Sequence, residues 1–345
     1  MTNNWTRIWF TTNSQQFIPQ KNKERIMDFL NKFPSRRISL IYDSRLLDTQ
    51  GQEDFLNFQK ELSLLNKSSQ IDFYDFSENS FQNNLLDSNE LTLYELANTE
   101  LQNLFKGGNV AAASDIVRTL SVVYRLGIYT DFDVEFLNSN LERFKTSSPF
   151  LCSVKGKVRC NDVLAIHPEM GLKKDLLNKY HDNIRLSYRL CKEYNSEERN
   201  QLRLEMVLNF LNLFEDDHEL VEEAIDKLFS IINKKYEEFY SLPMIFLIRK
   251  ACEEAMENEE NVNLKKIYKK IYMNNVISSV GPSALPSMSF TEESDCRKLQ
   301  QFVRGQVDLV ANDCAWLPPI LDNDKTERHE ETHERENTGI QSIRP

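Results

Sequence analysis

The chain has 345 residues, of which 40% are hydrophobic, and a formal net charge of −11. This length allows one large domain or two ordinary ones, with enough apolar residues for a substantial core. The acidic balance argues against nucleic acid as the main partner, because phosphate binding needs a basic surface. No apolar run approaches the roughly 20 residues that span a bilayer. We therefore expect no transmembrane segment, and the opening residues, MTNNWTRIWFTTN, lack the apolar core of a Sec signal peptide.

Strand and helix signals alternate over residues 1–165. The apolar runs TRIWFTT, RRISLIYDS, IDFYDF, SPFLCSV and KVRCNDVLAI predict strands. Helices between them are predicted by residues 21–33, by the apolar face Phe55, Phe58, Leu62 and Leu65, and by residues 83–107 and 109–126. Gly127 is expected to end the last of these by adopting a positive φ. This order predicts an α/β fold with a mixed, mostly parallel sheet covered by helices.

The second half of the chain changes to helical periodicity, which we place at about residues 170–275 as a helical insertion. The buried helix faces predicted there include Leu204, Val207, Leu208 and Leu211, and Val221, Ala224, Ile225, Leu228 and Ile232. A loop rich in turn formers follows at 278–287, and a further helix is expected over 293–310. From Asp322 onward the chain is charged and nearly free of apolar residues. We therefore expect a folded domain over residues 1–320 and a charged, disordered tail over 321–345.

The stretch NVAAASDIVRTLSVVYRLGIYTDFDVEF, residues 109–136, places three aspartates, an arginine and a tyrosine at one helix-to-strand junction. Asp115 and Arg118 lie on the opening turns of an apolar helical pattern. The strand IYTDFD follows, and alternation along a strand would place Asp131 and Asp133 on one face at its carboxyl end. Two carboxylates placed there repel each other unless a cation or a donor-rich ligand offsets their charge.

The paired aspartates allow three interpretations. The first is a solvated acidic strand end. The second is a haloacid-dehalogenase-type phosphatase, since DFDVE fits its DxD motif; that fold needs a later acidic pair after an apolar strand, whereas Asp216 and Asp217 lie in helical periodicity. The third is a metal-dependent sugar-nucleotide transferase, in which Mn²⁺ or Mg²⁺ on an aspartate neutralises a diphosphate leaving group.

The surrounding motifs favour the third interpretation. AAASDIVR, followed after ten residues by YTDFD, closely resembles the motifs of bacterial glycosyltransferases of the large glucosylating toxin type. It is similar also to their smaller effector relatives, including the arginine N-acetylglucosaminyltransferases. Further segments agree in order, namely RIWF, SLIYDS, NDVLAIHP and SVGPSAL. The resemblance spans about residues 5–318, is specific over 109–136, and implies a glycosyltransferase A-type, Rossmann-like fold.

The resemblance implies a role for three residues of the helix and the opening strand. Trp9 would stack on the uracil of the donor, and the alternative for Trp9 is ordinary core packing. Asp115 and Arg118 would hold hydroxyls of the donor sugar. The alternative for this pair is a structural salt bridge between residues three apart on one helix face.

The resemblance also assigns the strand end and a residue near the C-terminus. Tyr129 would lie beside the donor, Asp131 would contact the ribose, and Asp133 would ligate the metal directly. Trp316 would close over the diphosphate and touch the glycosidic oxygen.

Completion of the metal site is expected near the C-terminus, where the effectors use an Asn or Asp followed two residues later by a Ser. Asn312 occupies the first position here, with Asp313 as a second candidate. Cys314 stands where the serine would be, and a thiol is a poor ligand for a hard ion. The alternative for Asn312 is a polar cap of the preceding helix.

One departure from the family concerns the acceptor. The arginine-modifying effectors carry His-Glu-Asn ahead of the apolar strand, whereas this chain has Arg159, Cys160 and Asn161. A guanidinium stays protonated at neutral pH, so an enzyme that modifies it benefits from the carboxylate that is missing here. We therefore expect transfer to Ser, Thr or Tyr, although Asp162 could replace the missing glutamate.

The resemblance as a whole implies a retaining transferase that moves glucose or N-acetylglucosamine from a UDP-sugar to a protein side chain, with Mn²⁺ or Mg²⁺. The acceptor would be a host protein, reached by secretion from the bacterial cytoplasm into the host cytosol. The glutamates of the tail resemble acid-rich secretion signals. The phosphatase, and a UDP-sugar-binding module without transfer activity, remain the alternative functions.

Overall fold

A six-stranded mixed sheet forms the centre of the protein, with strand order β3-β2-β1-β4-β7-β6. Three neighbouring pairs are parallel and the two that involve β7 are antiparallel. The strands are β1 (Asn4–Trp9), β2 (Arg37–Tyr42), β3 (Ile71–Asp75), β4 (Ile128–Thr130), β6 (Phe150–Lys155) and β7 (Val158–Ile166). The α/β class and the mostly parallel sheet expected from the sequence are confirmed.

The computed structural model describes the chain over residues 4–85, 87–136, 148, 150–155, 158–167, 174–211, 218–281, 284–285, 290–299 and 303–305. Within these ranges no helix combines the length and the apolar character needed to cross a bilayer.

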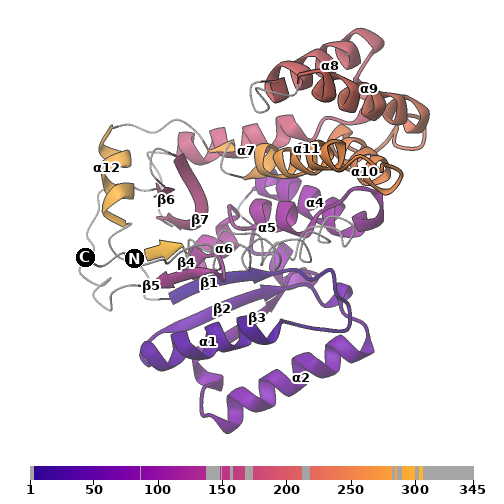
Figure 1. Cartoon of the computed structure of the whole chain (residues 1–345). Helices are drawn as coiled ribbons and strands as arrows, with labels where there is room; N and C mark the ends of the chain where they lie inside the picture. The colour runs from indigo at the N-terminus through magenta and orange to yellow at the C-terminus, as the bar shows by residue number, and fades with distance from the viewer. Residues whose placement is uncertain are drawn as a thin grey trace, which may run out of the picture.

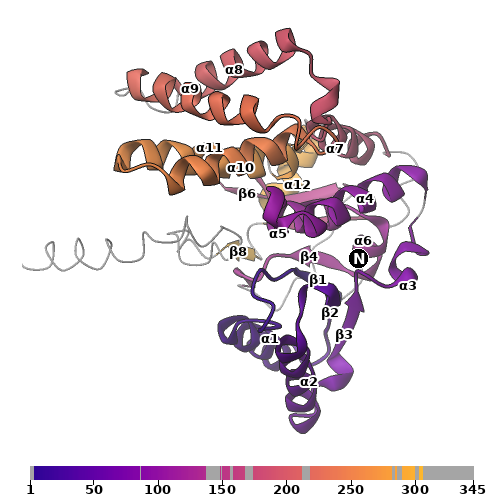
Figure 2. The same cartoon turned by 90° about the vertical axis from the view of Figure 1, so that its right-hand side faces the viewer.

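The helices of the first half cover both faces of the sheet (Figure 1). Figures 1 and 2 both show α1 (Gln20–Lys32) and α2 (Thr49–Leu64) on one side of β1–β3. The other side carries α4 (Ser88–Gln102), α5 (Val110–Val117) and α6 (Ser121–Leu126). Strands enclosed in this way are buried on both faces, as β1 is over residues 5–8 and β2 over residues 38–41.

The helix expected over residues 109–126 is in fact two helices, and this prediction was wrong. Leu120 adopts an extended conformation between α5 and α6. Buried Glu90 accepts hydrogen bonds from the backbone N–H of Ser121, at 2.9 Å, and from its hydroxyl. The carboxylate therefore satisfies the first turn of α6 in place of an N-cap residue, which stabilises the break.

Gly127 ends α6 as expected, but for a different reason. Its φ of 164° is ordinary extended backbone. A Cβ atom at this position would lie 2.2 Å from the carbonyl oxygen of Asn4. The glycine is therefore needed for the close approach of the chain to β1, where β4 joins the sheet.

Strand β4 ends at Thr130, so the alternation argument for the two aspartates does not hold. Asp131 and Asp133 lie in the turn that leads to β5 (Val134–Phe136). The N–H of Asp131 donates to the Asp162 carbonyl at 2.8 Å, and the Asp131 carbonyl accepts from the N–H of Val134 at 3.3 Å. The acidic pair thus lies at the carboxyl end of β4, but on a turn.

The helices α7–α11 stack on the α4–α6 side of the protein, farthest from α1 and α2 (Figure 2). They are α7 (Lys174–Ser187), α8 (Ser196–Leu211), α9 (His218–Lys235), α10 (Met244–Glu257) and α11 (Val262–Val280). The apolar face predicted for α9 is buried as expected. On α8 the prediction was wrong, because Leu204 and Leu208 are exposed whereas Met206 and Phe210 are buried.

The helix expected over residues 293–310 begins and ends earlier. Helix α12 spans Phe290–Leu299, and Val303–Gly305 forms β8, which pairs with β5 in a separate two-stranded sheet. The predicted tail over 321–345 and the acidic pair Asp216-Asp217 of the phosphatase interpretation lie outside the described residues.

His181 on α7 gives a prediction for stability against pH. Its ring, 2% exposed, contacts the Thr119 carbonyl through Nε2 at 3.3 Å, and burial lowers its pKa to about 4 from 6.5. The unfolded chain therefore binds a proton that the folded chain does not between these values. Stability is expected to fall by about 3 kcal/mol as pH drops from 6.5 to 4.

Denaturant unfolding at several pH values checks this. His181→Gln should flatten the slope over that window, whereas the same substitution at exposed His218 should leave it unchanged. Equal slopes for wild type and His181→Gln would contradict the assignment.

Candidate functional site

Arg118, at the carboxyl end of α5, lies between two of the predicted aspartates. Its Nη2 contacts Asp115 Oδ1 at 2.8 Å and Asp131 Oδ1 at 3.2 Å. The arginine side chain is 6% exposed and the aspartates are 13% and 33% exposed. The structure therefore brings together residues that the sequence places on a helix and beyond the following strand.

The rest of the guanidinium is held on every side. Nη1 donates to the Asn161 carbonyl at 2.8 Å, and the group lies over the Tyr129 ring at 4.3 Å. The Tyr129 hydroxyl in turn donates to Asp131 Oδ1. The Asn161 amide donates to Asp115 Oδ1 at 3.1 Å. A guanidinium, with five donors in one plane, suits this set of acceptors.

Burial and charge act against each other in this cluster. Burial raises the pKa of Asp115, while Arg118 and Asn161 lower it. Burial and then the neighbouring carboxylates Asp133 and Asp162 raise the pKa of Asp131, against the effect of Arg118. Burial opposes the charge on Arg118, but the two aspartates outweigh it and raise its pKa. The arginine is thus the cation that offsets part of the effect of burial on both carboxylates, although the pKa of Asp131 still rises to about 7.

The acidic turn supplies some, but not all, of the oxygen ligands that a hard divalent ion needs. Both contacts described for Asp131 engage Oδ1, from Arg118 and Tyr129, whereas Asp133 is half-buried in the turn two residues later. Within the described ranges no three Asp, Glu, His or Cys side chains are grouped to hold a metal. Mg²⁺ is commonly bound by one or two carboxylates together with substrate phosphates. Asp133 fits this mode of binding, because its carboxylate lies in the turn at the carboxyl end of β4.

The second predicted part of the site is Trp9, the last residue of β1. It is half-buried and packs edge-on against Phe132 of the acidic turn, with ring centroids 5.4 Å apart. Its Nε1 is buried and has no hydrogen-bond partner among the described residues. Trp9 therefore lies next to the aspartates, with an N–H that a ligand could satisfy.

Arg7 is a site residue that the sequence analysis missed. Its guanidinium lies over the same Phe132 ring at 5.0 Å, and buried Nη1 finds no acceptor in the described part of the chain. Burial and nearby Arg25 lower its pKa to about 10, whereas Asp133 and Asp131 raise it. A buried N–H donor without an acceptor, such as Nη1, is costly. The signal available in the sequence was a charged residue inside an otherwise apolar strand.

Thr130 adds a third polar atom to this group. Its Oγ1 is also buried without a hydrogen-bond partner among the described residues. The parallel register pairs Trp5 with Ile128 and Thr6 with Tyr129, so the next step places Arg7 beside Thr130. These atoms lie where the strand order turns from β3-β2-β1 to β4, and in α/β sheets ligands bind at this switch point.

The glycine-containing loop after α11 also reaches the cluster. A Cβ atom on Gly281 would lie 3.2 Å from Asp115 Oδ2. The resemblance of SVGPSAL to a family loop thus concerns a segment that contacts the aspartate of the DIVR motif. The other predicted residues, Trp316, Asn312 and Asp313, lie outside the described residues, so their roles stay predictions.

The acceptor segment lies on β7. Of the residues that stand for His-Glu-Asn, Asn161 bonds Asp115 and Arg118, and Cys160 is half-buried. Asp162 is 8% exposed and accepts a hydrogen bond from the Ser153 hydroxyl. It is the carboxylate on this segment whose charge reaches Asp131.

The acidic turn, the buried arginine and the polar atoms without hydrogen-bond partners thus lie together at the switch point of an α/β sheet, the place where proteins of this class bind ligands. Residues 1–167, just under half of the 345-residue chain, match the model of Glycosyltransferase family 88. This match covers the sheet and the cluster, and it confirms the resemblance to toxin-type glycosyltransferases. The enzyme class that the match supports is a glycosyltransferase.

Individual relatives are more distant. The chain is 30% identical over 128 residues to a protein described as "Toxin" from Photorhabdus asymbiotica, which is 36% of this chain and 4% of that protein. The chain thus spans a small fraction of its relative's length.

Among solved structures, the chain resembles the PaToxG glycosyltransferase at a TM-score of 0.38 and 16% identity, with 88% of each chain covered. It resembles the catalytic domain of Clostridium novyi alpha-toxin at a TM-score of 0.43 and 12% identity, with 96% of this chain and 82% of that chain covered. For the UDP-bound glycosyltransferase domain of the YGT toxin, the TM-score is 0.37 and the identity 10%, with 87% of this chain and 97% of that chain covered.

The position of Trp9 leads to a prediction for nucleotide binding. Trp9→Ala is expected to weaken UDP binding by roughly 1–3 kcal/mol, the range for base–aromatic stacking. Quenching of tryptophan fluorescence by UDP, followed by titration calorimetry, measures it. Trp5→Phe is the control, since Trp5 is 5% exposed and packs on Phe29 of α1. Unchanged UDP affinity in Trp9→Ala would show that Trp9 is only a packing residue.

Proposed function

We propose that this chain is a glycosyltransferase that transfers a sugar from a UDP-sugar to a protein side chain with the help of Mn²⁺ or Mg²⁺. The observation that carries the proposal is the convergence of Asp115, Arg118 and Asp131 beside Trp9 at the switch point of the sheet. The match to Glycosyltransferase family 88 over residues 1–167 supports the reaction class.

The roles of the residues follow from their chemistry. Trp9 offers an aromatic face for the uracil, and Asp131 accepts from the ribose. Asp133 supplies the oxygen ligand for the ion, which offsets charge on the diphosphate. Arg118 and Asp115 orient the sugar hydroxyls as a donor and an acceptor. Trp316 would close the site, and Asn312, or Asp313, would complete the metal ligands.

Arg7 and Thr130 support an acceptor-rich ligand at the same place. Buried donors without acceptors carry a desolvation cost that a bound ligand can remove. A nucleoside diphosphate brings carbonyl, hydroxyl and phosphate oxygens to the switch point. We place this ligand over the carboxyl ends of β1 and β4.

We propose that transfer retains the anomeric configuration, as in the glycosyltransferases that the motifs resemble. Acceptor and leaving group would then react on the same face of the sugar. The bond from the anomeric carbon to the β-phosphate oxygen breaks, the bond to the acceptor oxygen forms, and the departing phosphate takes the hydroxyl proton. Exclusion of water by the closed site would limit hydrolysis.

The acceptor is proposed to be a Ser, Thr or Tyr hydroxyl of a host protein. The reason is the missing glutamate: Cys160 supplies no charge at this place, and Arg159 would repel a second guanidinium. A hydroxyl is already neutral, so, unlike a protonated guanidinium, it needs no carboxylate to take up a proton.

The test is to incubate the protein with Mn²⁺ and UDP-glucose, UDP-N-acetylglucosamine or GDP-mannose, and to follow thermal shift and nucleotide release. Mass spectrometry of a host-cell lysate treated in the same way locates the sugar. Binding of a UDP-sugar and modified hydroxyl residues support the proposal. Sugar on arginine would overturn the acceptor assignment and point to Asp162. Binding without release would favour a binding module, and phosphate release from a model ester without UDP would favour the phosphatase.

A further inference from the structure

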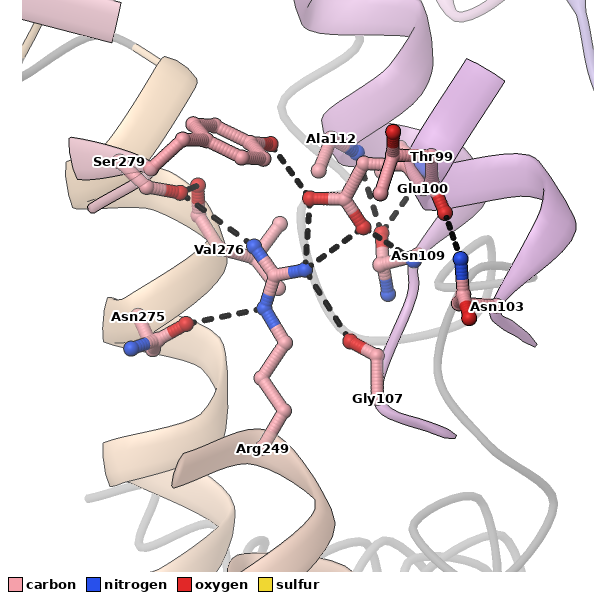
Figure 3. A network of polar contacts seen from close by, with 12 residues as sticks. Thr99, Glu100, Asn103, Gly107, Asn109, Ala112, Arg249, Asn275, Val276 and Ser279 are labelled. Atoms are coloured by element: carbon pink, nitrogen blue, oxygen red, sulfur yellow. Dashed lines mark hydrogen bonds and ion pairs between the residues drawn. The ribbon is translucent and has the colours of Figure 1, made fainter. Parts of the chain in front are cut away.

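A second buried ion pair lies away from the aspartates, between α4 and α10. Arg249 Nη1 contacts both carboxylate oxygens of Glu100 at 2.8 Å, and neither side chain is exposed. Figure 3 shows the two side chains facing each other between the helices. The residues are 149 positions apart, so the pair joins the first half of the chain to the helices α7–α11.

The pair is enclosed by further hydrogen bonds. Arg249 Nε donates to Asn275 Oδ1 at 2.9 Å and Nη1 to the Gly107 carbonyl at 3.2 Å. Glu100 also accepts from the Tyr188 hydroxyl. Because the desolvation of such a pair is compensated only by good geometry, this set of partners is required for the pair to persist.

The network ends on Asn109, the residue before α5, which is the helix that carries Asp115 and ends at Arg118. Glu100 Oε2 accepts from the backbone N–H of Asn109 at 2.6 Å (Figure 3). The Asn109 side chain is the N-cap of α5, accepting from the N–H groups of Ala111 at 2.8 Å and Ala112 at 3.1 Å. Helix α5 has eight residues, and Asp115 and Arg118 lie on its last turn and C-cap.

Helix α11 holds α5 at both ends. The Asn109 amide donates to the Tyr272 hydroxyl at 3.2 Å at the start of α5. At the other end Gly281, which follows α11, lies against Asp115. Ser279 of α11 accepts from Arg249 Nη2 at 3.3 Å, so the same helix also contacts the ion pair.

We propose that the Glu100–Arg249 pair positions the donor sugar by fixing Asn109, the cap of the helix that bears Asp115 and Arg118. The helices α7–α11 thereby become part of the donor site. Glu100, Arg249 and Asn109 are positioning residues, since none of them belongs to the cluster itself. The inference rests on the proposed function.

A shift of α5 should disturb the sugar contacts of Asp115 and Arg118 more than the nucleotide contacts. A positioning role can therefore be told apart from a general loss of stability. Trp9, Asp131 and Asp133, which are assigned to the nucleotide and the ion, belong to β1 and to the turn after β4 and not to α5. Of these three, Asp131 contacts the C-cap of α5, since it lies 3.2 Å from Arg118. Loss of the Asn109 cap should therefore change donor turnover while UDP binding is kept.

The experiment compares UDP affinity with hydrolysis of UDP-glucose and UDP-N-acetylglucosamine, both with Mn²⁺, in folded variants checked by circular dichroism. Asn109→Ala is expected to lower hydrolysis by about tenfold or more, because small misplacements of reacting groups are costly. UDP affinity should stay within about twofold of wild type. Asn109→Ser keeps an oxygen that can cap the helix and should restore most of the rate.

Asn261→Ala is the matched control. Asn261 caps α11 in the same way, through the N–H groups of Asn263 and Leu264. It lies at the far end of that helix, about 30 Å from Gly281 at 1.5 Å per residue. Hydrolysis should be unchanged. An equal loss in Asn261→Ala, or a parallel loss of UDP binding in Asn109→Ala, would overturn the inference.

The ion pair itself is tested by removing both charges together in Glu100→Gln/Arg249→Met. A single substitution would leave one buried charge alone and could unfold the chain. The double variant should show the same selective loss of hydrolysis, and wild-type hydrolysis would overturn the role of the pair. If the wild type binds no UDP and hydrolyses neither donor, the proposed function fails first and this inference fails with it.

Discussion

Asp133→Asn is expected to abolish the dependence of UDP binding on the metal. In the wild type, adding Mn²⁺ should raise UDP affinity at least about tenfold, which is about 1.4 kcal/mol of coupling. The substitution keeps the shape of the side chain but removes the charge that a hard ion needs. Transfer should fall by more than about 100-fold, since the ion offsets charge that develops on the leaving diphosphate.

Titration calorimetry with UDP in Mn²⁺ and in EDTA measures the coupling, and release of UDP measures turnover. Asp72→Asn is the control for loss of one negative charge. Asp72 lies on β3 and pairs with Arg37 at 2.6 Å in an exposed ion pair, which contributes little. Equal UDP affinity with Mn²⁺ and with EDTA in the wild type would reject a metal-dependent donor site.

The local parts of this site could be predicted from the sequence. Spacing of three on a helix places Asp115 and Arg118 on one face, and the structure has them in contact at 2.8 Å. That contact is also what a structural salt bridge would give, so the donor role stays a proposal. The alternation of strands and helices likewise predicted a mostly parallel sheet covered by helices, because it depends on neighbouring segments.

The contacts between residues far apart in the sequence could not be predicted, since hydrophobic periodicity does not indicate which segments pack against each other. The contact of Arg118 with Asp131 depends on where β4 ends, and the capping of α6 by Glu90 joins residues 31 positions apart. On α8 both Leu204–Leu208 and Met206–Phe210 fit a spacing of four, and packing against α9 decides between them. Arg7 was overlooked because it stands in an apolar strand.

Arg118→Lys is expected to abolish transfer while the protein stays folded. Lysine keeps the charge, but its ammonium is a single point, whereas the guanidinium reaches Asp115, Asp131 and the Asn161 carbonyl at once and stacks over Tyr129. A free-energy loss of about 1–3 kcal/mol in stability follows from acceptors left without donors. Arg125→Lys on the exposed side of α6 is the control and should match wild type in both measurements.

Arg118→Met separates charge from geometry. It leaves Asp115 buried without its cation, so the cost should be about 3–5 kcal/mol at neutral pH. Burial already raises the pKa of Asp115, and removal of Arg118 raises it further. A raised carboxyl pKa stabilises the folded state at low pH, and this stability is lost as pH rises through the folded pKa. The stability that the variant loses relative to wild type should therefore be smallest in acid and grow towards neutral pH, as denaturant unfolding at several pH values can measure. Full transfer activity in Arg118→Lys, or a pH-independent loss in Arg118→Met, would show that Arg118 holds neither the sugar nor the charge of the aspartates.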